Sequence, residues 1–373
     1  FQGLASDDDN DETPLVIPLV DFSHVGERDR VGGRSFFDFN MLALTRAQGT
    51  DTRRIALHPR WERPYIASSG DVYKLTLGLN TDVYHVNSLV RDGDKTNYSG
   101  FSYRAVPYMA MDWRRPMVKR IGSISQILEP IASLALAPNG GNPDKIPNED
   151  STDFEFDETN LFSDNRFTGI DRLEGGPRIN YGLNWGVTGA QGGHTNIFFG
   201  QSYRLRTDDT FAAGSGLEEN FSDWVGKVEI APGGHFHLLY RTRLANDNFA
   251  PRRNEIQLTA GVPAFRVAGN YVFLESQEDS EFDGREEANL TVNSQINREW
   301  RASVSTVRDM DASEVRSLGV NLIFENECLI FNTGVTRTFF EDRDIQPTDT
   351  ISFLVTLKTI GEVKTGFSGL DEF

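Results

Sequence analysis

The sequence of 373 residues has a single cysteine and no long apolar run. Its longest apolar stretches, residues 14–20 and 131–138, are far shorter than the ~20 residues that a transmembrane helix needs. This excludes a polytopic helical membrane protein. One cysteine excludes an internal disulfide framework and a cysteine-rich zinc site. Basic residues are also too few for a nucleic-acid-binding protein, because 37 Lys and Arg stand against 55 Asp and Glu, giving a net charge of −18.

The first residues lack the features of a protein start or of a secretory signal. Phe1-Gln2-Gly3-Leu4 includes no initiator Met, and neither a basic nor an apolar signal region follows. We therefore expect this chain to be the C-terminal part of a longer protein.

Apolar residues alternate with small or polar residues through most of the chain. In one run, Tyr181, Leu183 and Trp185 fall on one face of a strand, whereas Asn180 and Asn184 fall on the other. No stretch repeats its apolar residues at helical spacing, so the sequence predicts an all-β protein. The same alternation recurs in residues 73–80, 255–262, 288–296, 317–324 and 351–358.

These runs predict an antiparallel transmembrane β-barrel. Turn signals divide the chain into about seventeen strands, many of them longer than the ~5–6 residues usual in soluble sheets. The polar face is rich in Gly, Asn, Gln and Thr, as a wet lumen would be. Aromatic and Arg residues gather near strand ends, in residues 60–65, 112–115 and 299–301, where an interfacial girdle would lie. A chain of soluble β-sandwiches, such as a surface adhesin, is the alternative.

Candidate catalytic and metal-binding residues are weak. His235 and His237 are two residues apart and could share a strand face, but no third ligand accompanies them. The acidic stretches 150–157 and 341–344 lack the spacing and central Gly of a calcium loop, so we expect solvated loops. No nucleophile elbow or phosphate-binding Gly-rich loop is present, and the sequence predicts neither an enzyme nor a bound cofactor.

Residues 137–171 form a long segment without alternation, and loops of that length are usually functional or flexible. A string that starts in this segment and continues to residue 182 resembles LptD, the lipopolysaccharide-assembly protein of Gram-negative outer membranes. Weaker resemblance extends from residues 18–22 to the final alternating run. The motif residues that carry the resemblance are Asp150, Ser151, Phe154, Phe156, Asp157, Asn160, Asn165, Arg166, Asp171, Arg172, Glu174, Gly175 and Gly176.

The resemblance implies a function in lipopolysaccharide assembly. Family members have a signal peptide, a periplasmic jellyroll and a 26-strand barrel plugged by the lipoprotein LptE. Lipopolysaccharide enters the jellyroll from the bridge protein LptA and reaches the outer leaflet through a lateral gate between the first and last barrel strands. Here the jellyroll and early strands would be missing. The expected last strand, residues 351–360, would place Ile351, Phe353, Val355 and Leu357 at the gate.

The resemblance also gives the lone cysteine a role. Cys328 lies between two predicted strands, and the family places a cysteine here that joins the periplasmic domain. Glu327 stands where the family often has a second cysteine, so a single interdomain disulfide is expected. A passive porin or a ligand-gated outer-membrane transporter remains the competing interpretation, because its strands would alternate in the same way.

Overall fold

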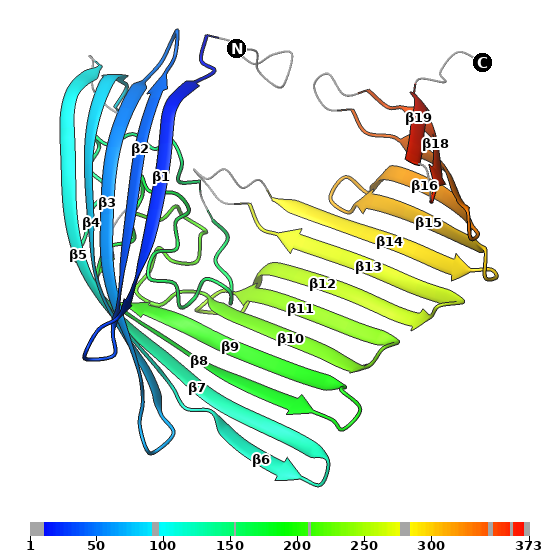
Figure 1. The fold of residues 1–373 in the computed structure, drawn as a ribbon, viewed down its shortest axis with the longest axis horizontal. Coiled ribbons are helices and arrows are strands. Elements are labelled where there is room, and N and C mark those ends of the chain that lie inside the picture. The colour runs from blue at the N-terminus through cyan, green and yellow to red at the C-terminus, as the bar shows by residue number, and fades with distance from the viewer. Residues whose placement is uncertain are drawn as a thin grey trace.

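The chain folds into one continuous antiparallel sheet. The computed structural model describes residues 11–91, 97–152, 154–207, 210–276, 284–341 and 346–358, and the backbone alone of 361–368. Within these ranges there are nineteen strands and no helix, hence no helix long and apolar enough to cross a membrane (Figure 1). The strands are β1 (Leu15–Arg28), β2 (Arg34–Thr45), β3 (Asp51–Ile66), β4 (Val72–Leu89), β5 (Tyr98–Arg114), β6 (Met117–Ile121), β7 (Ile124–Leu136), β8 (Arg178–Thr188), β9 (His194–Arg204), β10 (Trp224–Gly233), β11 (Phe236–Leu244), β12 (Pro251–Val262), β13 (Phe265–Leu274), β14 (Arg285–Gln295), β15 (Trp300–Asp309), β16 (Glu314–Glu325), β17 (Leu329–Thr338), β18 (Asp349–Leu357) and β19 (Gly361–Ser368).

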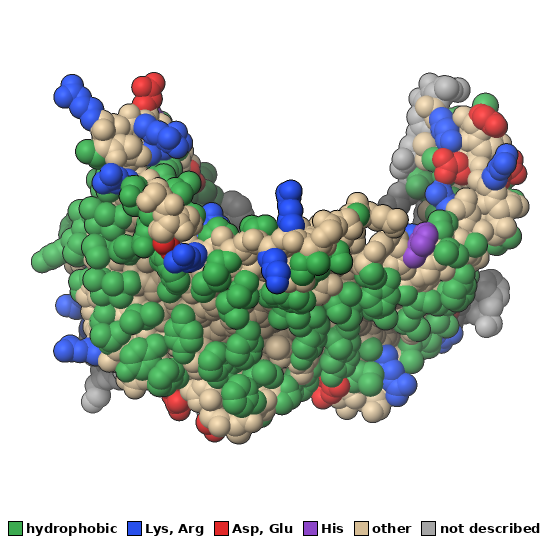
Figure 2. All heavy atoms as spheres, turned by 90° about the horizontal axis from the view of Figure 1, so that it is seen from below, with side chains coloured by type: hydrophobic (Ala, Val, Ile, Leu, Met, Phe, Trp, Pro, Cys, Tyr) green, Lys and Arg blue, Asp and Glu red, His purple; other side chains and the backbone are tan. Residues whose placement is uncertain are grey.

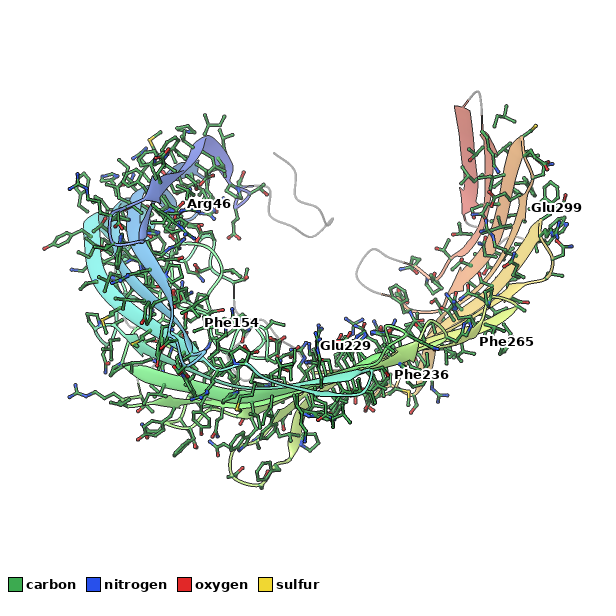
Figure 3. All side chains as sticks on the ribbon, turned by 60° about the horizontal axis from the view of Figure 1, so that its bottom comes forward. Arg46, Phe154, Glu229, Phe236, Phe265 and Glu299 are labelled. Atoms are coloured by element: carbon green, nitrogen blue, oxygen red, sulfur yellow. The ribbon has the colours of Figure 1, made fainter. Side chains whose placement is uncertain are left out.

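Each strand pairs with its neighbours in the chain, except that β5 and β6 do not pair with each other, so the sheet is a meander. Strands β5 and β6 pair with successive parts of β7, and Pro116, which has no N–H to donate, lies in the break between them. The sheet curls into an open trough, with β1 and β19 on its two facing ends (Figures 1 and 3). This is the antiparallel sheet of a transmembrane β-barrel, and it confirms the predicted fold class.

The register places apolar residues on the convex face and polar residues on the concave face. Val292, Val304, Val320, Val335 and Ile351 are direct partners across five consecutive strands. Val304, Val320 and Val335 are each about half exposed, as lipid-facing residues of an isolated barrel are. Figure 2 shows the resulting band of hydrophobic side chains around the convex face, with charged side chains concentrated above and below it. Such a band is typical of a barrel in a bilayer.

The faces predicted for the run around residue 183 are confirmed. Leu183 is 47% exposed on the convex face, whereas Asn180 is 1% exposed on the concave face. Gly182 also lies on the concave face, where an added Cβ would be 2.8 Å from the ring of Phe198. The small residues of the polar face therefore make room for larger neighbours.

Connections differ between the two rims of the trough. One rim, which we call the short-turn rim, has brief turns such as residues 67–70, 189–193 and 326–328. The other, the long-loop rim, carries residues 137–177 and 205–223. Trp61, Trp113 and Trp300 all lie near the short-turn rim, as expected for an interfacial girdle. Short periplasmic turns and long extracellular loops are the usual polarity of outer-membrane barrels.

The structure corrects the predicted end of the sheet. The prediction that residues 351–360 form the last strand is wrong, because Ile351, Phe353, Val355 and Leu357 lie in β18, which pairs with β17 on one side and β19 on the other. The sequence of β19, Gly-Glu-Val-Lys-Thr-Gly-Phe-Ser, has only two large apolar residues. Its alternation is therefore too weak to mark a strand.

Candidate functional site

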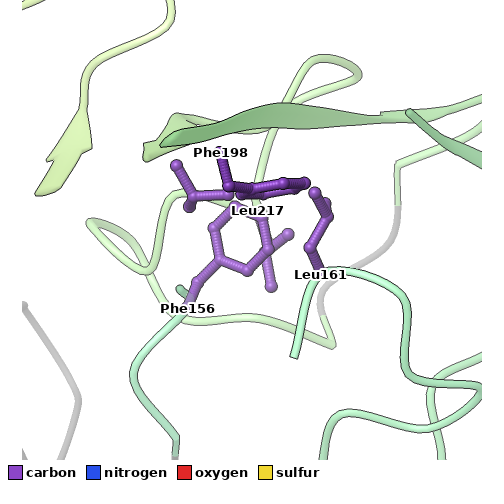
Figure 4. Close-up of a cluster of buried hydrophobic side chains, with 5 residues drawn as sticks. Phe156, Leu161, Phe198 and Leu217 are labelled. Atoms are coloured by element: carbon purple, nitrogen blue, oxygen red, sulfur yellow. The ribbon is translucent and has the colours of Figure 1, made fainter. Parts of the chain in front are cut away.

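Residues 137–177, which we call the inner loop, fold back against the concave face instead of extending from the rim. Figure 3 shows Phe154 from this loop inside the trough. The loop and residues 205–223, the second inner segment, share a hydrophobic cluster of Phe156, Leu161, Phe198, Leu217 and Val225 (Figure 4). A fully buried side chain of this size contributes about 1.5–3 kcal/mol to stability. The cluster therefore fixes the inner loop to β9 and β10.

A glycine of the inner wall permits this contact. An added Cβ on Gly200 in β9 would lie 2.6 Å from Leu161 and 2.9 Å from the Phe198 ring. A larger residue at Gly200 would push the loop away from the sheet.

The first polar anchor joins the inner loop to β3 and β4. Arg54 Nη1 lies 2.6 Å from Asp171 Oδ1 and 2.7 Å from Asp150 Oδ2. The Tyr84 hydroxyl donates a hydrogen bond to the same Asp171 oxygen at 2.8 Å. The side chains of Arg54 and Asp171 are almost fully buried. Since an unpaired buried charge is strongly destabilising, these contacts specify one position for the loop.

The two aspartates of this anchor also close the loop on itself. Asp150 Oδ1 accepts hydrogen bonds from the backbone N–H groups of Ile170 and Asp171. Asp171 Oδ2 accepts them from the N–H groups of Glu149 and Asp150 in return. Burial tends to raise the pKa of Asp150, but the N–H groups and Arg54 outweigh it and leave that pKa below its usual range. Asp150 is therefore ionised at neutral pH.

Arg104 on β5 provides the neighbouring anchor. Its guanidinium donates to the backbone carbonyls of Ile170 and Asp171 and to Asp82 Oδ2. Asp82 also lies 2.8 Å from His58 Nε2. Arg104 and Asp82 therefore form an ion pair within the sheet, and the remaining N–H groups of Arg104 hold the loop backbone.

The second polar anchor is a single carboxylate surrounded by three guanidiniums. Glu174 Oε1 lies 2.6 Å from Arg166 Nη1, 2.7 Å from Arg204 Nη2 and 3.3 Å from Arg178 Nε. Burial lowers the pKa of Arg166 to about 10, against the opposing effect of Glu174. Arg166 Nη2 also donates to Asn180 Oδ1 at 2.9 Å, and Asn180 donates to Ser133. This anchor joins the loop to β7, β8 and β9.

The other motif residues shape the loop. Ser151 Oγ accepts a bond from the Arg172 N–H, Asn160 Oδ1 from the Asp157 N–H, and Asn165 Oδ1 from the Glu174 N–H. Asp157 Oδ2 lies 3.0 Å from Arg253 Nη1 of β12. Phe154 packs edge-on against Phe167, over which the Arg172 guanidinium lies.

The glycines of the motif are required by close packing and backbone conformation. An added Cβ on Gly175 would lie 2.4 Å from the carbonyl oxygen of Gly140, and Gly176 has a φ of 84°. The structure therefore brings all the motif residues into one folded unit.

Sequence reasoning missed the wall residues that hold this unit. Arg54, Arg104 and Arg204 lie on the concave face of their strands, and each reaches a loop residue far away in the sequence. The sequence feature that could have identified these wall residues is an arginine on a strand face that otherwise carries small and polar residues. It indicates a buried partner but does not identify that partner.

The predicted histidine pair is not brought together as a site. His235 precedes β11, whereas His237 lies within it. The Nε2 atoms of His237 and His194 each lie 3.4 Å from Glu229 Oε1. Across the described ranges no group of three or more His, Cys, Asp or Glu residues is arranged to hold a metal ion. Residues 342–344 of the acidic stretch 341–344 lie outside those ranges.

The exposed Cys328 lies in the turn between β16 and β17, on the short-turn rim, as predicted. Its N–H donates to Asn326 Oδ1, and its carbonyl accepts from the Lys358 N–H. The disulfide expected for it remains a prediction.

Fold and site together define an antiparallel transmembrane β-barrel protein with a folded inner loop. The sequence profile of the LptD family, described as LPS transport system D, matches residues 1–300. The chain belongs to this family, which is a family of transport and assembly proteins, and membership points to the outer membrane of Gram-negative bacteria.

Individual relatives are distant. The LPS-assembly protein LptD of Vibrio cholerae is 23% identical over 227 residues, which is 55% of this chain and 28% of that protein. Among solved structures, the copper transporter OprC is 10% identical with a TM-score of 0.34, covering 94% of this chain and 65% of OprC. A triple mutant of the Rhodopseudomonas blastica porin is 10% identical with a TM-score of 0.26, covering 96% of this chain and all of the porin.

Proposed function

We propose that this chain is the C-terminal part of the 26-strand LptD barrel, with the signal, jellyroll and early strands outside it. In this proposal the barrel translocates lipopolysaccharide to the outer leaflet through a lateral gate. The match of residues 1–300 to LptD carries the proposal. No covalent bond changes in such a transfer, so no catalytic residue is required.

The chemistry of the two faces supports this function. Lipopolysaccharide has a large sugar head, which should not cross hydrocarbon, and acyl chains, which should not cross water. The concave face offers Asn, Gln, Thr and Gly side chains to the sugars, and the convex face meets lipid. A sideways opening between strands would let the acyl chains leave directly into the membrane.

The gate would lie between the C-terminal hairpin, β18 and β19, and the first strand of the complete barrel. Strand β1 pairs with β2 through one edge, and no other described strand covers its second edge. Unpaired strand edges are not viable in lipid. We therefore infer that the preceding strands of the same protein pair with β1, and that the first strand of the complete barrel meets the outer edge of β19.

The proposed partners follow from the family. An LptE-type lipoprotein would occupy the trough beside the inner loop, and LptA would deliver lipopolysaccharide to the jellyroll. Membrane lipids would contact the apolar band, and Cys328 would form the disulfide that aligns the jellyroll with the gate. Nucleic acid has no place in this proposal, given the acidic composition.

A passive porin or ligand-gated transporter is the second candidate, because the sheet alone fits it equally well. Complementation separates the two functions. In cells depleted of the native protein, the full-length protein should restore lipopolysaccharide at the cell surface. Surface lipopolysaccharide is measured by labelling intact cells with a reagent that does not cross the outer membrane. Restored solute uptake without surface lipopolysaccharide would refute the proposal and favour a porin.

A further inference from the structure

A polar cavity lies between the inner loop and the concave face of β2–β5. Its volume is about 380 Å³, within the roughly 300–1,000 Å³ of small-molecule pockets. Arg60 and Asn80 contribute from the wall, and Asp164 and Glu174 contribute from the loop. Arg60 follows Arg54 along β3 toward the short-turn rim, so the cavity lies on the side of the first polar anchor that faces this rim.

Glu174 borders this cavity with its backbone, because its side chain has no accessible surface although the residue as a whole is 5% exposed. The Glu174 side chain is fully buried, and its Oε1 atom takes the contacts to all three arginines. Its Oε2 atom accepts no hydrogen bond. Oε2 also has no accessible surface, so a molecule in the cavity does not reach it, and Asp164 is the loop carboxylate that lines the cavity. Burial also raises the pKa of the neighbouring Asp164 carboxyl, with Lys74 opposing this effect.

An aromatic ring forms part of the wall of the same cavity. A Cβ added to Gly78 on β4 would lie 2.3 Å from the ring of Tyr108, so this ring lies flat over the glycine. Tyr108 and Gly78 are direct partners across β4 and β5. One face of the ring is therefore held against the sheet, which leaves a fixed, flat apolar surface in an otherwise polar cavity.

The lining fits hydroxyl groups better than it fits ions. Carboxylates from Asp38 and Asp164 outnumber the single accessible guanidinium of the lining, that of Arg60, which disfavours a phosphate. A divalent cation would need several clustered oxygen ligands, and no such group is found among the described residues. A hydroxyl group both donates and accepts hydrogen bonds, so it matches a lining of carboxylates, amides and guanidiniums.

We propose that this cavity binds a neutral, hydroxyl-rich sugar unit, with its hydroxyl groups bonded to Asp164 and Asn80 and its ring stacked on Tyr108. The proposal rests on the proposed function, since it assigns a contact to the sugar part of lipopolysaccharide as it passes from the short-turn rim. The cavity would then act as a holding point beneath the inner loop.

Saturation-transfer NMR on the full-length protein in detergent tests the proposal. The probe is a lipid-free, dephosphorylated core oligosaccharide. Asn80→Phe fills the cavity, and Asn270→Phe makes the same change on the concave face of β13, outside it. Asn80→Phe should weaken binding about tenfold, whereas Asn270→Phe should not change it. Tyr108→Leu should also weaken binding and provides a milder variant if Asn80→Phe does not assemble.

Each outcome decides the proposal. Absence of sugar binding to the wild-type protein would mean that the cavity holds water alone, and equal binding by Asn80→Phe and Asn270→Phe would place the sugar elsewhere. Displacement of the sugar by inorganic phosphate would point to an anion site instead. Surface lipopolysaccharide in complemented cells reports the proposed function separately, so a protein that exports lipopolysaccharide without binding the sugar would overturn this inference alone.

Discussion

Glu174 of the inner loop and Arg204 of β9 are thirty residues apart in the sequence, yet Glu174 Oε1 lies 2.7 Å from Arg204 Nη2 in a buried site. This ion pair is one of three around a single carboxylate. In the part of the chain that the structure describes, side-chain contacts such as these, together with the hydrophobic cluster, hold the inner loop against the sheet.

Replacement of Glu174 by Gln should release the inner loop. Arg166, Arg178 and Arg204 would lose their shared counter-charge, and removing one partner of a buried ion pair destabilises by about 3–5 kcal/mol. We expect faster proteolysis within residues 137–177 of the assembled barrel. Glu299→Gln, in an exposed turn of the short-turn rim, is the matched control and should leave proteolysis unchanged. Equal protection in both variants would contradict the anchoring role.

The two faces of β8 should respond differently to charge. Leu183→Arg places a cation in the apolar band, where it should cost ~2–4 kcal/mol near mid-bilayer. Asn184→Arg places the same residue on the concave face and should be tolerated. Heat-modifiable migration on gels measures assembly of the complete barrel, and equal assembly defects in the two variants would reverse the assignment of faces.

The second inner segment should become less stable as pH rises. Burial raises the pKa of Asp223 from 3.8 to about 6, although Arg243 opposes the effect. Between pH 3.8 and about 6, Asp223 is therefore protonated in the folded state but ionised in the unfolded state. This difference stabilises the folded state, and the stabilisation is lost as pH rises through about 6. Hydrogen exchange of residues 214–223, corrected for intrinsic rates, should show more frequent opening at pH 7 than at pH 5.

Asp223→Asn should remove this pH dependence, because the amide carries no charge at either pH. Asp247→Asn, at the exposed turn between β11 and β12, is the control and should retain the wild-type response. A pH dependence that persists unchanged in Asp223→Asn would assign it to another group.

The sequence predicted most of the strands and a long segment without alternation, but not the inward fold of that segment or its contacts with the strands. Alternation shows which face of β3 Arg54 occupies, because period two follows from strand geometry alone. It does not show that Arg54 meets Asp171, 117 residues later, because that contact depends on how the loop folds back into the trough. The family motif marked the loop residues but gave no information on their wall partners. Strand β19 was missed because its two apolar residues carry too little periodic signal.

Crosslinks at the proposed gate should block export. A disulfide that joins β19 to the first strand of the complete barrel should stop surface delivery of lipopolysaccharide, and reduction should restore it. Cysteines at Gly334 and Ser352, direct partners in β17 and β18, provide a control crosslink within the closed part of the sheet. Export that continues through a verified crosslink at the gate would exclude this seam.

Cys328 should form a disulfide with a cysteine in the periplasmic domain of the full-length protein. The cysteine is exposed in a turn on the short-turn rim, which is the periplasmic rim by the usual polarity of such barrels. The periplasm is oxidising, so an accessible thiol there tends to be paired. Non-reducing peptide mapping should link the Cys328 peptide to a peptide outside this chain. In a Cys328→Ser protein, Ala312→Cys, in a turn of the opposite rim, should remain a free thiol. A free Cys328 in export-competent protein would overturn the claim, since alignment of the lipid-delivering domain would then need no covalent tie.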